Sequence, residues 1–491
     1  MLRTGLHLSG GVDTERPLSM VKILNRIVND WRTSAQTAEG GRNVPRKTVI
    51  IGGGPAGTGA AGGVKAVDPS AEVVLYTQFE DIAYSPCGIP YVHGGEIDSF
   101  DRLILAGKQA YVDAGIDVHY ESTVTSINTA KKTITVKGEG EVSYDSLVIG
   151  TGFAYADPGV PGTDLGGLYY VKNIRAAQEW DKVIANSKRA VVVEASPLAM
   201  EMVTALAHRG IETHLIDPNP YALSNMADAD IMAPVEESFR ELGIHLHFNT
   251  TLEAFLGDSE GKLRAIKTSA GEIPVDLAVV ATHKTPNNAL AAAAGIKIGS
   301  TGGLVVDENM KTSAPDVWAA GDACEIPHGL AGTPLQGLTG SHAYAQGKTA
   351  GQNAGGGSKA YRTVFIPWGT PAGKWVIGGA SFGEATATAL GIPYIVGVAE
   401  GVSRSRYYSG VKKTKLKILA DPKSHKILGA QMVGGGDGIK ERADFLAQAI
   451  RFGMTLEDLA TMESVFSPAI GALTEPIVAA ANNGLAAAKK G

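Results

Sequence analysis

The segment KTVIIGGGPAG, Lys47–Gly57, decides the fold class of this chain. A short β-branched strand runs into a glycine turn, a helical Ala/Gly-rich stretch follows, and a second strand, AEVVLYT, begins at Ala71. Gly52, Gly54 and Gly57 fit the G-x-G-x-x-G pattern between a strand and a helix. In that pattern the glycines permit the tight turn, the approach of a pyrophosphate and the packing of the helix on the sheet. The segment predicts a dinucleotide-binding βαβ unit, with a purely structural glycine turn as the alternative.

Composition narrows the class of protein further. The 491 residues carry a net charge of −6 and are 44% hydrophobic, which is typical of a globular chain of about two to four domains. The mild acidity argues against binding to nucleic acid or to a membrane surface. Only two cysteines occur, which argues against a disulfide-stapled secreted fold and against a metal site built from cysteines. Because neither a signal peptide nor a long apolar run is visible, we expect a cytoplasmic protein without a membrane span.

Residues 1–46 are predicted to be an N-terminal extension with one amphipathic helix. Two interpretations stay open, because the apolar face of such a helix packs either on its own domain or on a partner or second subunit. The face at helical spacing consists of Met20, Ile23, Leu24, Ile27, Val28 and Trp31.

Two further segments extend the dinucleotide-binding pattern. YDSLVIGTGFAY, Tyr144–Tyr155, reads as a strand that ends in Thr-Gly, and APDVWAAGDACEIP, Ala314–Pro327, reads as a strand that ends in Gly-Asp. An aspartate at the carboxyl end of a strand, such as Asp322, can reach a ribityl hydroxyl of a flavin. Alone, such an aspartate is more often a helix cap. Together with the first glycine motif, it favours a flavin.

These segments resemble those of the pyridine nucleotide–disulfide oxidoreductases, from about Lys47 to Asn482. The resemblance implies an α/β fold with two Rossmann-like domains, one for FAD and one NAD-like, followed by an α+β C-terminal dimerisation domain. It also implies a homodimer. The expected boundaries are 47–157 with 285–357 for a discontinuous FAD domain, 158–284 for the NAD(P)H-like domain and 358–491 for the dimerisation domain.

The resemblance also implies FAD contacts outside the first glycine motif and Asp322. Thr77 stands where an acid for the flavin ribose is usual, and nearby Glu80 is a candidate substitute, since a carboxylate is the stronger hydrogen-bond acceptor. The stretch Gly337–Gly351 matches a helix whose N-terminus faces the flavin pyrimidine and stabilises its negative charge. The other implied FAD contacts are Ser85, Val124, Gly152, Gly340, Ser341 and Ala343.

The segment YSPCGIPYVHGGEI, Tyr84–Ile97, resembles the single-cysteine branch of the family, which contains coenzyme A-disulfide reductases, NADH oxidases and peroxidases, and persulfide reductases. The resemblance makes Cys87 the redox-active residue. We expect a helix N-terminus to lower the pKa of the Cys87 thiol, so that the thiolate exchanges with a disulfide or persulfide beside the flavin. An inert buried cysteine is the alternative for Cys87 and the expectation for Cys324.

The C-terminal third resembles the family's dimerisation domain, including SRSRYYSG, Ser403–Gly410. Tyr407 and Tyr408 match family tyrosines, and both interface packing and proton donation to the active site stay open as their roles. Met462 stands where close relatives carry a tyrosine before the late FSP motif, which counts against coenzyme A-disulfide chemistry.

The second glycine motif of the family is degenerate in this chain. In the segment Arg189–Asp217 the glycine positions hold Glu194, Ser196 and Ala199. The side chain of Glu194 is expected to fill the place of the pyrophosphate and to repel it, and serine adopts a positive φ only at a cost. Asp217 still ends the second strand, where an acid holds the adenine ribose of NADH. The alignment rests on Glu201, which together with Asp217 is a candidate NAD contact.

The chain is therefore predicted to be an FAD-dependent oxidoreductase that transfers an electron pair through Cys87, with no metal site. The candidate substrates are coenzyme A disulfide, a persulfide or polysulfide, a peroxide and oxygen, with NAD(P)H as the donor. Because of Glu194, a second hypothesis is a flavoprotein subunit that a partner protein reduces. A flavin-binding scaffold without turnover is a third.

Overall fold

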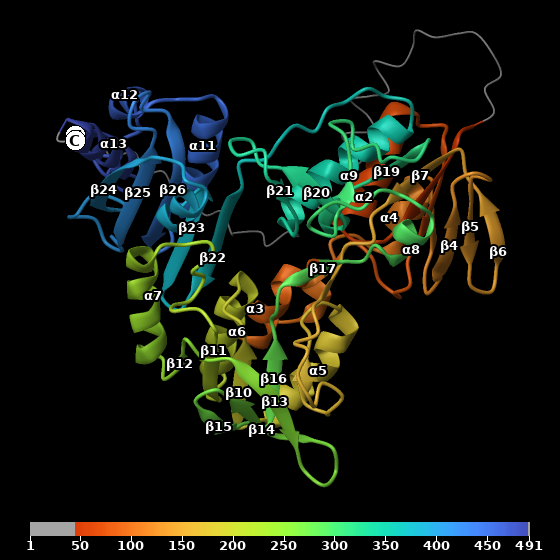
Figure 1. Cartoon of the computed structure of the whole chain (residues 1–491), viewed down its shortest axis with the longest axis horizontal. Helices are drawn as coiled ribbons and strands as arrows, with labels where there is room; N and C mark the ends of the chain where they lie inside the picture. Colours follow the sequence, from red (N-terminus) through yellow and green to blue (C-terminus); the bar gives the residue numbers. More distant parts are fainter. Residues whose placement is uncertain (1–44, 490–491) are drawn as a thin grey trace, which may run out of the picture.

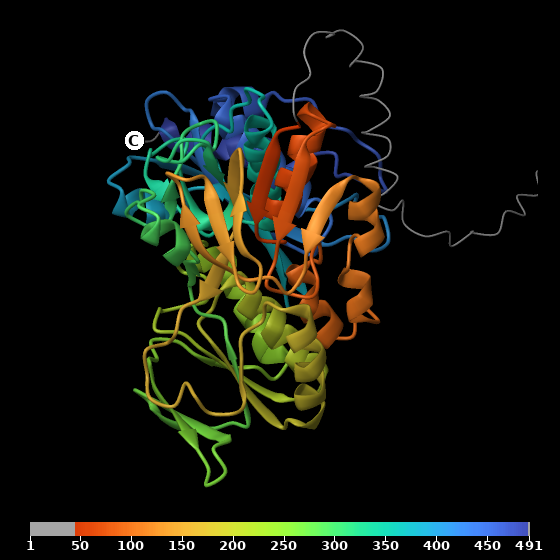
Figure 2. The same cartoon turned by 90° about the vertical axis from the view of Figure 1, so that its right-hand side faces the viewer.

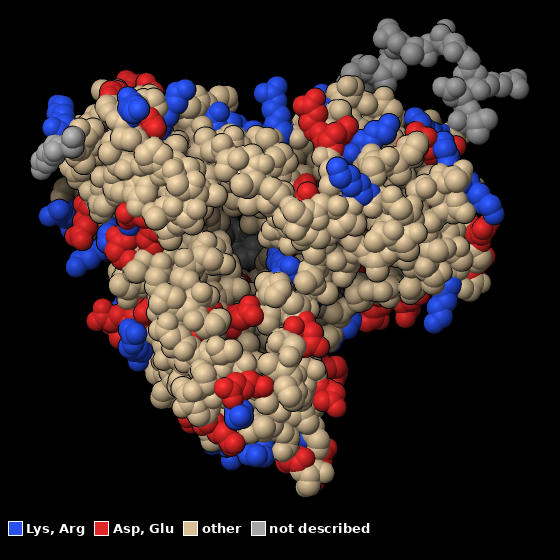
Figure 3. Space-filling view, viewed as in Figure 1, with Lys and Arg blue, Asp and Glu red and all other residues tan. Residues whose placement is uncertain are grey.

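The computed structural model describes residues 45–489 of the chain. These residues form three lobes (Figure 1) around a central hollow, which the space-filling view shows with a basic side chain at its rim (Figure 3). The predicted helix between Met20 and Trp31 lies outside the described residues. Within residues 45–489, no helix has both the length and the apolar character needed to cross a membrane.

The first lobe contains a parallel five-stranded sheet with the strand order β19-β7-β1-β2-β3. Its strands are short and β-branched, as expected for a parallel sheet covered on both faces. Their bounds are β1 Lys47–Ile51, β2 Glu72–Tyr76, β3 Ile116–His119, β7 Ser146–Ile149 and β19 Val317–Ala319. An antiparallel sheet of β4 Val124–Asn128, β5 Thr133–Val136 and β6 Gly140–Ser143 stands beside it (Figure 2).

Helices α2 (Pro55–Val67) and α9 (Gly340–Ala354) pack directly against each other in the first lobe. Glycines make this approach possible, because a Cβ at Gly347 would lie 2.0 Å from the carbonyl oxygen of Ala56. A Cβ at Gly59 would lie 2.6 Å from the carbonyl oxygen of Tyr344. The Ala/Gly richness of both helices is therefore a packing requirement, and it fixes the N-terminus of α9 beside the first glycine turn.

The second lobe repeats the parallel topology, with the strand order β12-β11-β10-β16-β9. Its strands are β9 Leu168–Tyr169, β10 Arg189–Val193, β11 Glu212–Ile216, β12 His245–His247 and β16 Leu277–Val280. Its helices are α5 Ile174–Asn186, α6 Pro197–His208 and α7 Ala229–Glu241. A meander of β13 Leu252–Gly257, β14 Leu263–Thr268 and β15 Gly271–Pro274 packs on it. The antiparallel pair β8 (Phe153–Tyr155) and β17 (Lys284–Pro286) joins the two lobes.

The third lobe is an antiparallel sheet with the strand order β22-β23-β26-β25-β24, packed against helices α11 and α13. Its strands are β22 Pro367–Ala372, β23 Trp375–Ser381, β24 Ile395–Val402, β25 Lys413–Ala420 and β26 Ile427–Gly434. Its helices are α10 Glu384–Ala389, α11 Ile439–Arg451, α12 Leu456–Ala460 and α13 Pro476–Ala488. The two parallel sheets and this antiparallel one confirm the predicted fold class.

Short elements complete the described part of the chain. They are η1 Pro86–Gly88, α3 Ile89–His93, η2 Phe100–Leu103, α4 Lys108–Asp113, α8 Ala289–Ala293, β18 Leu304–Val305, η3 Gly321–Ala323, β20 Cys324–Pro327 and β21 Pro334–Leu335.

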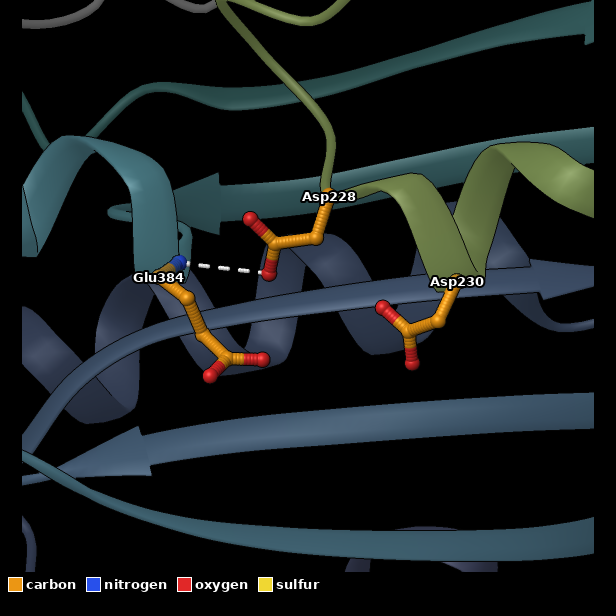
Figure 4. A group of neighbouring side chains, drawn as sticks. All are labelled: Asp228, Asp230 and Glu384. Carbon is orange, nitrogen blue, oxygen red and sulfur yellow. Dashed lines mark hydrogen bonds between the residues drawn. The ribbon is translucent and has the colours of Figure 1, made fainter.

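A group of acidic side chains joins the second and third lobes (Figure 4). The ammonium group of Lys417, which is 3% exposed, lies 3.1 Å from Asp228, 2.5 Å from Asp230 and 2.5 Å from Glu384. Asp228 also accepts a hydrogen bond from the backbone amide of Glu384 at 3.2 Å, which ties α10 to the start of α7. Because Lys417 pairs with all three carboxylates and Lys415 also pairs with Asp230 at 2.7 Å, we interpret the group as an ion-pair network between lobes and not as a metal site.

Candidate active site

The first glycine turn has the shape of a pyrophosphate cradle. Gly52 has a φ of +111°, and a Cβ there would lie 2.2 Å from the carbonyl oxygen of Gly150, so that a side chain is excluded. A Cβ at Gly57 would lie 1.8 Å from the backbone oxygen of Gly52. A Cβ at Gly54 would meet nothing within 4 Å, and no side chain caps α2 at this residue. The turn thus presents an open face and the N-terminus of a helix to an anion.

The parallel sheet brings further predicted FAD contacts to the same edge. Thr77, Gly152 and Asp322 follow the carboxyl ends of β2, β7 and β19; β2 and β7 flank β1, and β19 lies beside β7. Ligands of open α/β sheets bind outside this edge. A Cβ at Gly152 or at Gly340, the first residue of α9, would meet nothing within 4 Å, so open space borders these positions as well. This open, amide-lined edge fits an elongated dinucleotide such as FAD.

The remaining predicted FAD contacts give weaker support for a flavin site. The Thr77 hydroxyl accepts a hydrogen bond from the amide of Phe79 at 3.3 Å. Glu80, the candidate substitute, forms an ion pair with Arg175 at 2.9 Å on the surface. Ser85 directly precedes η1, and Val124 is buried at the start of β4. In α9, Ala343 is buried, and the hydroxyl of Ser341 lies 2.8 Å from the hydroxyl of Thr339.

Asp322 is paired with a lysine that the sequence did not single out. It is 9% exposed, and its Oδ2 lies 3.0 Å from the Nζ of Lys284. The Lys284 ammonium also lies 4.4 Å from the ring centroid of Phe153, and the Lys172 ammonium lies 4.3 Å from the same centroid, so that both form cation–π contacts with this ring. Burial lowers the pKa of Lys172, Asp322 opposes the shift and Lys284 adds to it, so that the pKa is about 8. Two lysines therefore concentrate positive charge beside Asp322.

Cys87 lies in η1, directly before the short helix α3. Its thiol is exposed to solvent, although enough protein surrounds it for desolvation to be the largest influence on its pKa. Desolvation and the nearby carboxylates of Glu201 and Asp322 raise the pKa of Cys87, while Lys284 lowers it. The expected lowering of this pKa is therefore wrong, because burial and the two acids outweigh Lys284. Cys324 is buried, as predicted.

Glu201 belongs to the group around Cys87. On α6, it accepts hydrogen bonds from the Tyr91 hydroxyl at 2.9 Å and the Thr370 hydroxyl at 3.2 Å. Burial raises the pKa of Glu201 to about 7, although both hydrogen bonds lower it. Its carboxyl group thus lies between α3, α6 and β22, within electrostatic reach of Cys87, and titrates near neutrality. The alignment to the second glycine motif could not reveal these partners, which come from distant segments.

The second glycine turn differs from the first in conformation and in charge. Glu194 has a φ of +67°, whereas Ser196 has an ordinary φ of −85° and accepts a hydrogen bond from Ala199. The positive φ that we expected to burden the serine therefore falls on the glutamate. The Glu194 carboxylate accepts a hydrogen bond from the amide of His283 at 3.1 Å. Asp217 directly follows the last residue of β11, at the predicted end of this strand, and is 5% exposed.

Tyr407 and Tyr408 lie between β24 and β25 in the third lobe, with exposures of 78% and 41%. Arg404 stacks on the Tyr408 ring at 6.0 Å from its centroid. Neither phenol is among the groups that shift the pKa of Cys87 within the described chain.

Comparison with known proteins identifies the family. The family model described as pyridine nucleotide-disulphide oxidoreductase matches residues 46–350, and the model of its dimerisation domain matches residues 374–476. The chain therefore belongs to the pyridine nucleotide-disulphide oxidoreductase family, which confirms the resemblance, and it is an FAD-dependent oxidoreductase.

Individual relatives match over nearly their whole length. The chain is 32% identical to an NADH oxidase of Methanocaldococcus jannaschii over 446 residues, which cover 89% of this chain and 98% of that protein. It is 30% identical to an NAD(P)H coenzyme A polysulfide/persulfide reductase of Pyrococcus horikoshii over 452 residues, with coverage of 89% and 98%. The solved structure of an NAD-dependent persulfide reductase from A. fulgidus superimposes with a TM-score of 0.86 at 29% identity, and covers 90% of this chain and 83% of that one.

Proposed function

We propose that this enzyme reduces a thiol-derived substrate through Cys87, with FAD as the bound electron carrier and NADH or NADPH as the donor. One observation carries the proposal. The solvent-exposed Cys87 lies within electrostatic reach of two acids, Asp322 and Glu201. Asp322 stands at the sheet edge where the open glycine turn and α9 converge, and Glu201 is a titratable carboxyl group. A sulfur nucleophile, a cofactor cradle and a proton-holding group are thus gathered in one place.

The chain's own residues suffice to hold FAD. The amides of the first glycine turn and the N-terminus of α2 would bind the pyrophosphate, Thr77 would contact the ribose, and Asp322 would bind the ribityl chain. When bound there, FAD supplies two-electron redox chemistry. The N-terminus of α9 would stabilise negative charge on the flavin pyrimidine.

Cys87 would perform the sulfur chemistry. Its thiolate attacks one sulfur of a disulfide or persulfide, the S–S bond breaks, and the other sulfur leaves as a thiolate or hydrosulfide. Two electrons then cleave the mixed disulfide and return Cys87 to its thiolate. Lys284 favours the thiolate form of Cys87, and Glu201, with a pKa of about 7, is suited to give a proton to the departing sulfur.

Relatives named NADH oxidase and persulfide reductase support both oxygen and sulfur acceptors, and among these we favour a persulfide, since Met462 counts against coenzyme A-disulfide chemistry. We also propose a cytoplasmic homodimer with the domain boundaries predicted above. Large apolar side chains exposed in the third lobe support the dimer, and Tyr407 and Tyr408 would then lie at or near its interface. These apolar residues are Phe452, Val465, Phe466, Ile470 and Leu473.

The test is turnover by the FAD-loaded enzyme with NADH or NADPH and either coenzyme A disulfide or a persulfide. Cys87→Ser should reduce turnover to background while NADH still bleaches the flavin, and Cys324→Ala should behave as wild type. Full activity in Cys87→Ser would contradict the proposal.

A second candidate function has its own support in Glu194, whose charged side chain occupies the dinucleotide turn. In this alternative, the chain is a flavoprotein subunit that a partner protein reduces. Flavin that dithionite reduces but neither nicotinamide does would favour this alternative.

A further inference from the structure

We infer that the second glycine turn carries a carboxylate latch, and that a nicotinamide dinucleotide binds there only when Glu194 takes up a proton and releases its backbone partner. The inference rests on the proposed function, because it concerns how NADH or NADPH reaches this enzyme. It would make Glu194 a residue that controls the access of the donor.

The two glycine turns can be compared position by position. In the first, the amide of Gly52 donates to the carbonyl oxygen of Tyr76 at 2.8 Å. In the second turn, the amide of Glu194 donates to the carbonyl oxygen of Ile216 at 3.0 Å. Both donors follow the first strand of a βαβ unit, and both have a positive φ, +111° and +67°. Glu194 is therefore the structural counterpart of Gly52, and it carries a side chain where the first turn excludes one.

The Glu194 side chain forms a hydrogen bond in that position. Its Oε2 accepts the backbone amide of His283, which follows β16. This hydrogen bond offsets part of the strain of a left-handed glutamate, a conformation that glycine adopts without cost. The anchored carboxylate therefore adds a negative charge at the turn that a pyrophosphate would approach.

Other donors of the second turn are occupied as well. The amide of Ala195 donates to Asp217 at 2.6 Å, and the Asp217 carboxylate also accepts the amide of Asn219 at 2.7 Å. The Ser196 hydroxyl accepts the amide of Ala199 at 3.3 Å. The first turn has no such side-chain cap at Gly54. A pyrophosphate arriving at the second turn would therefore meet amides already bonded and two carboxylates of its own sign.

Protonation of Glu194 would relieve this conflict. The titratable groups that face it are Asp217, after β11, and His283, after β16. Burial and Asp217 raise the pKa of Glu194, whereas His283 lowers it, and the net shift is upward. The neutral acid repels phosphate less and binds the His283 amide less strongly than the carboxylate does. Above the pKa of Glu194, dinucleotide affinity should then fall by up to about tenfold per pH unit.

The test uses ADP-ribose, whose pyrophosphate does not titrate near neutrality, and calorimetry on the FAD-loaded enzyme from about pH 5 to pH 9. Wild type should bind more weakly as pH rises. Glu194→Gln and Glu194→Gly should bind at least tenfold more tightly than wild type at the alkaline end, with a flat pH profile. A flat wild-type profile, or a Glu194→Gln profile that keeps the wild-type slope, would overturn the latch.

Two control variants separate the causes. Glu121 also has a positive φ, +51°, and is exposed outside the second lobe, so Glu121→Gly relieves similar strain and should leave ADP-ribose affinity unchanged. His283→Asn should keep the wild-type pH dependence of ADP-ribose affinity. If this pH dependence is lost in His283→Asn but kept in Glu194→Gln, the effect belongs to His283 and the latch is overturned. Failure of the latch is distinguishable from failure of the proposed function. The latch fails if ADP-ribose binds independently of pH, whereas the function fails if Cys87→Ser keeps full turnover.

Discussion

Replacing Glu201 with glutamine tests the electrostatics of the Cys87 site most sharply. Burial raises the pKa of Glu201 from 4.5 to about 7 in the folded chain. Between these two pH values, the folded state keeps a proton that the unfolded chain has released, so the stability of the fold falls as pH rises. A difference of about 2.5 pH units corresponds to about 3 kcal/mol of stability lost between pH 4 and pH 8.

Glutamine keeps the shape and can still accept hydrogen bonds from Tyr91 and Thr370, but it has no proton to lose. Relative to wild type, Glu201→Gln should gain about 3 kcal/mol between pH 4 and pH 8, measured as the difference in urea unfolding free energy. Glu237→Gln, an exposed position on α7, is the control and should show no such gain. The reasoning is refuted if wild type and Glu201→Gln have the same pH dependence of unfolding.

Three further predictions concern the fold and the assembly. Lys417→Met leaves Asp228 buried without its cation, and it should cost about 3 kcal/mol in urea unfolding at pH 7; a loss below about 1 kcal/mol would contradict the ion-pair network. Gly347→Val should abolish FAD binding, followed by flavin absorbance, because its Cβ would lie 2.0 Å from a backbone oxygen of α2; a yellow, stable variant would refute the packing argument. Ile470→Lys, at a side chain 71% exposed, should yield monomers in sedimentation, whereas Val112→Lys, 64% exposed in the first lobe, should not. Monomeric wild type would refute the proposed dimer.

The sequence was sufficient for features that short segments determine. The glycine spacing of Lys47–Gly57 identified the first turn, because Gly52 and Gly57 are required by backbone contacts within one βαβ unit. The helix and strands of Arg189–Asp217 were predicted even though the glycines are missing, since their apolar patterns are local.

Features that depend on distant segments could not be predicted in this way. Lys284 lies far in sequence from both Cys87 and Asp322, and no motif marks it. The direction of the Cys87 pKa shift was predicted wrongly, because it depends first on burial and then on Glu201, which folding brings from the second lobe. The positive φ of Glu194 was missed as well: the alignment put Glu194 on a glycine position, but only the bulk and charge of its side chain were weighed there and the conformational cost was assigned to Ser196.

The most direct measurement of the central claim is a single-turnover experiment without a nicotinamide. FAD-loaded wild type and Cys87→Ser are each reduced anaerobically with dithionite and mixed with coenzyme A disulfide or a persulfide while flavin absorbance is recorded. The account predicts rapid recovery of the flavin band in wild type with at least one of these acceptors and none in Cys87→Ser. Equal recovery in both proteins, or none in wild type with either acceptor, would contradict electron transfer through Cys87.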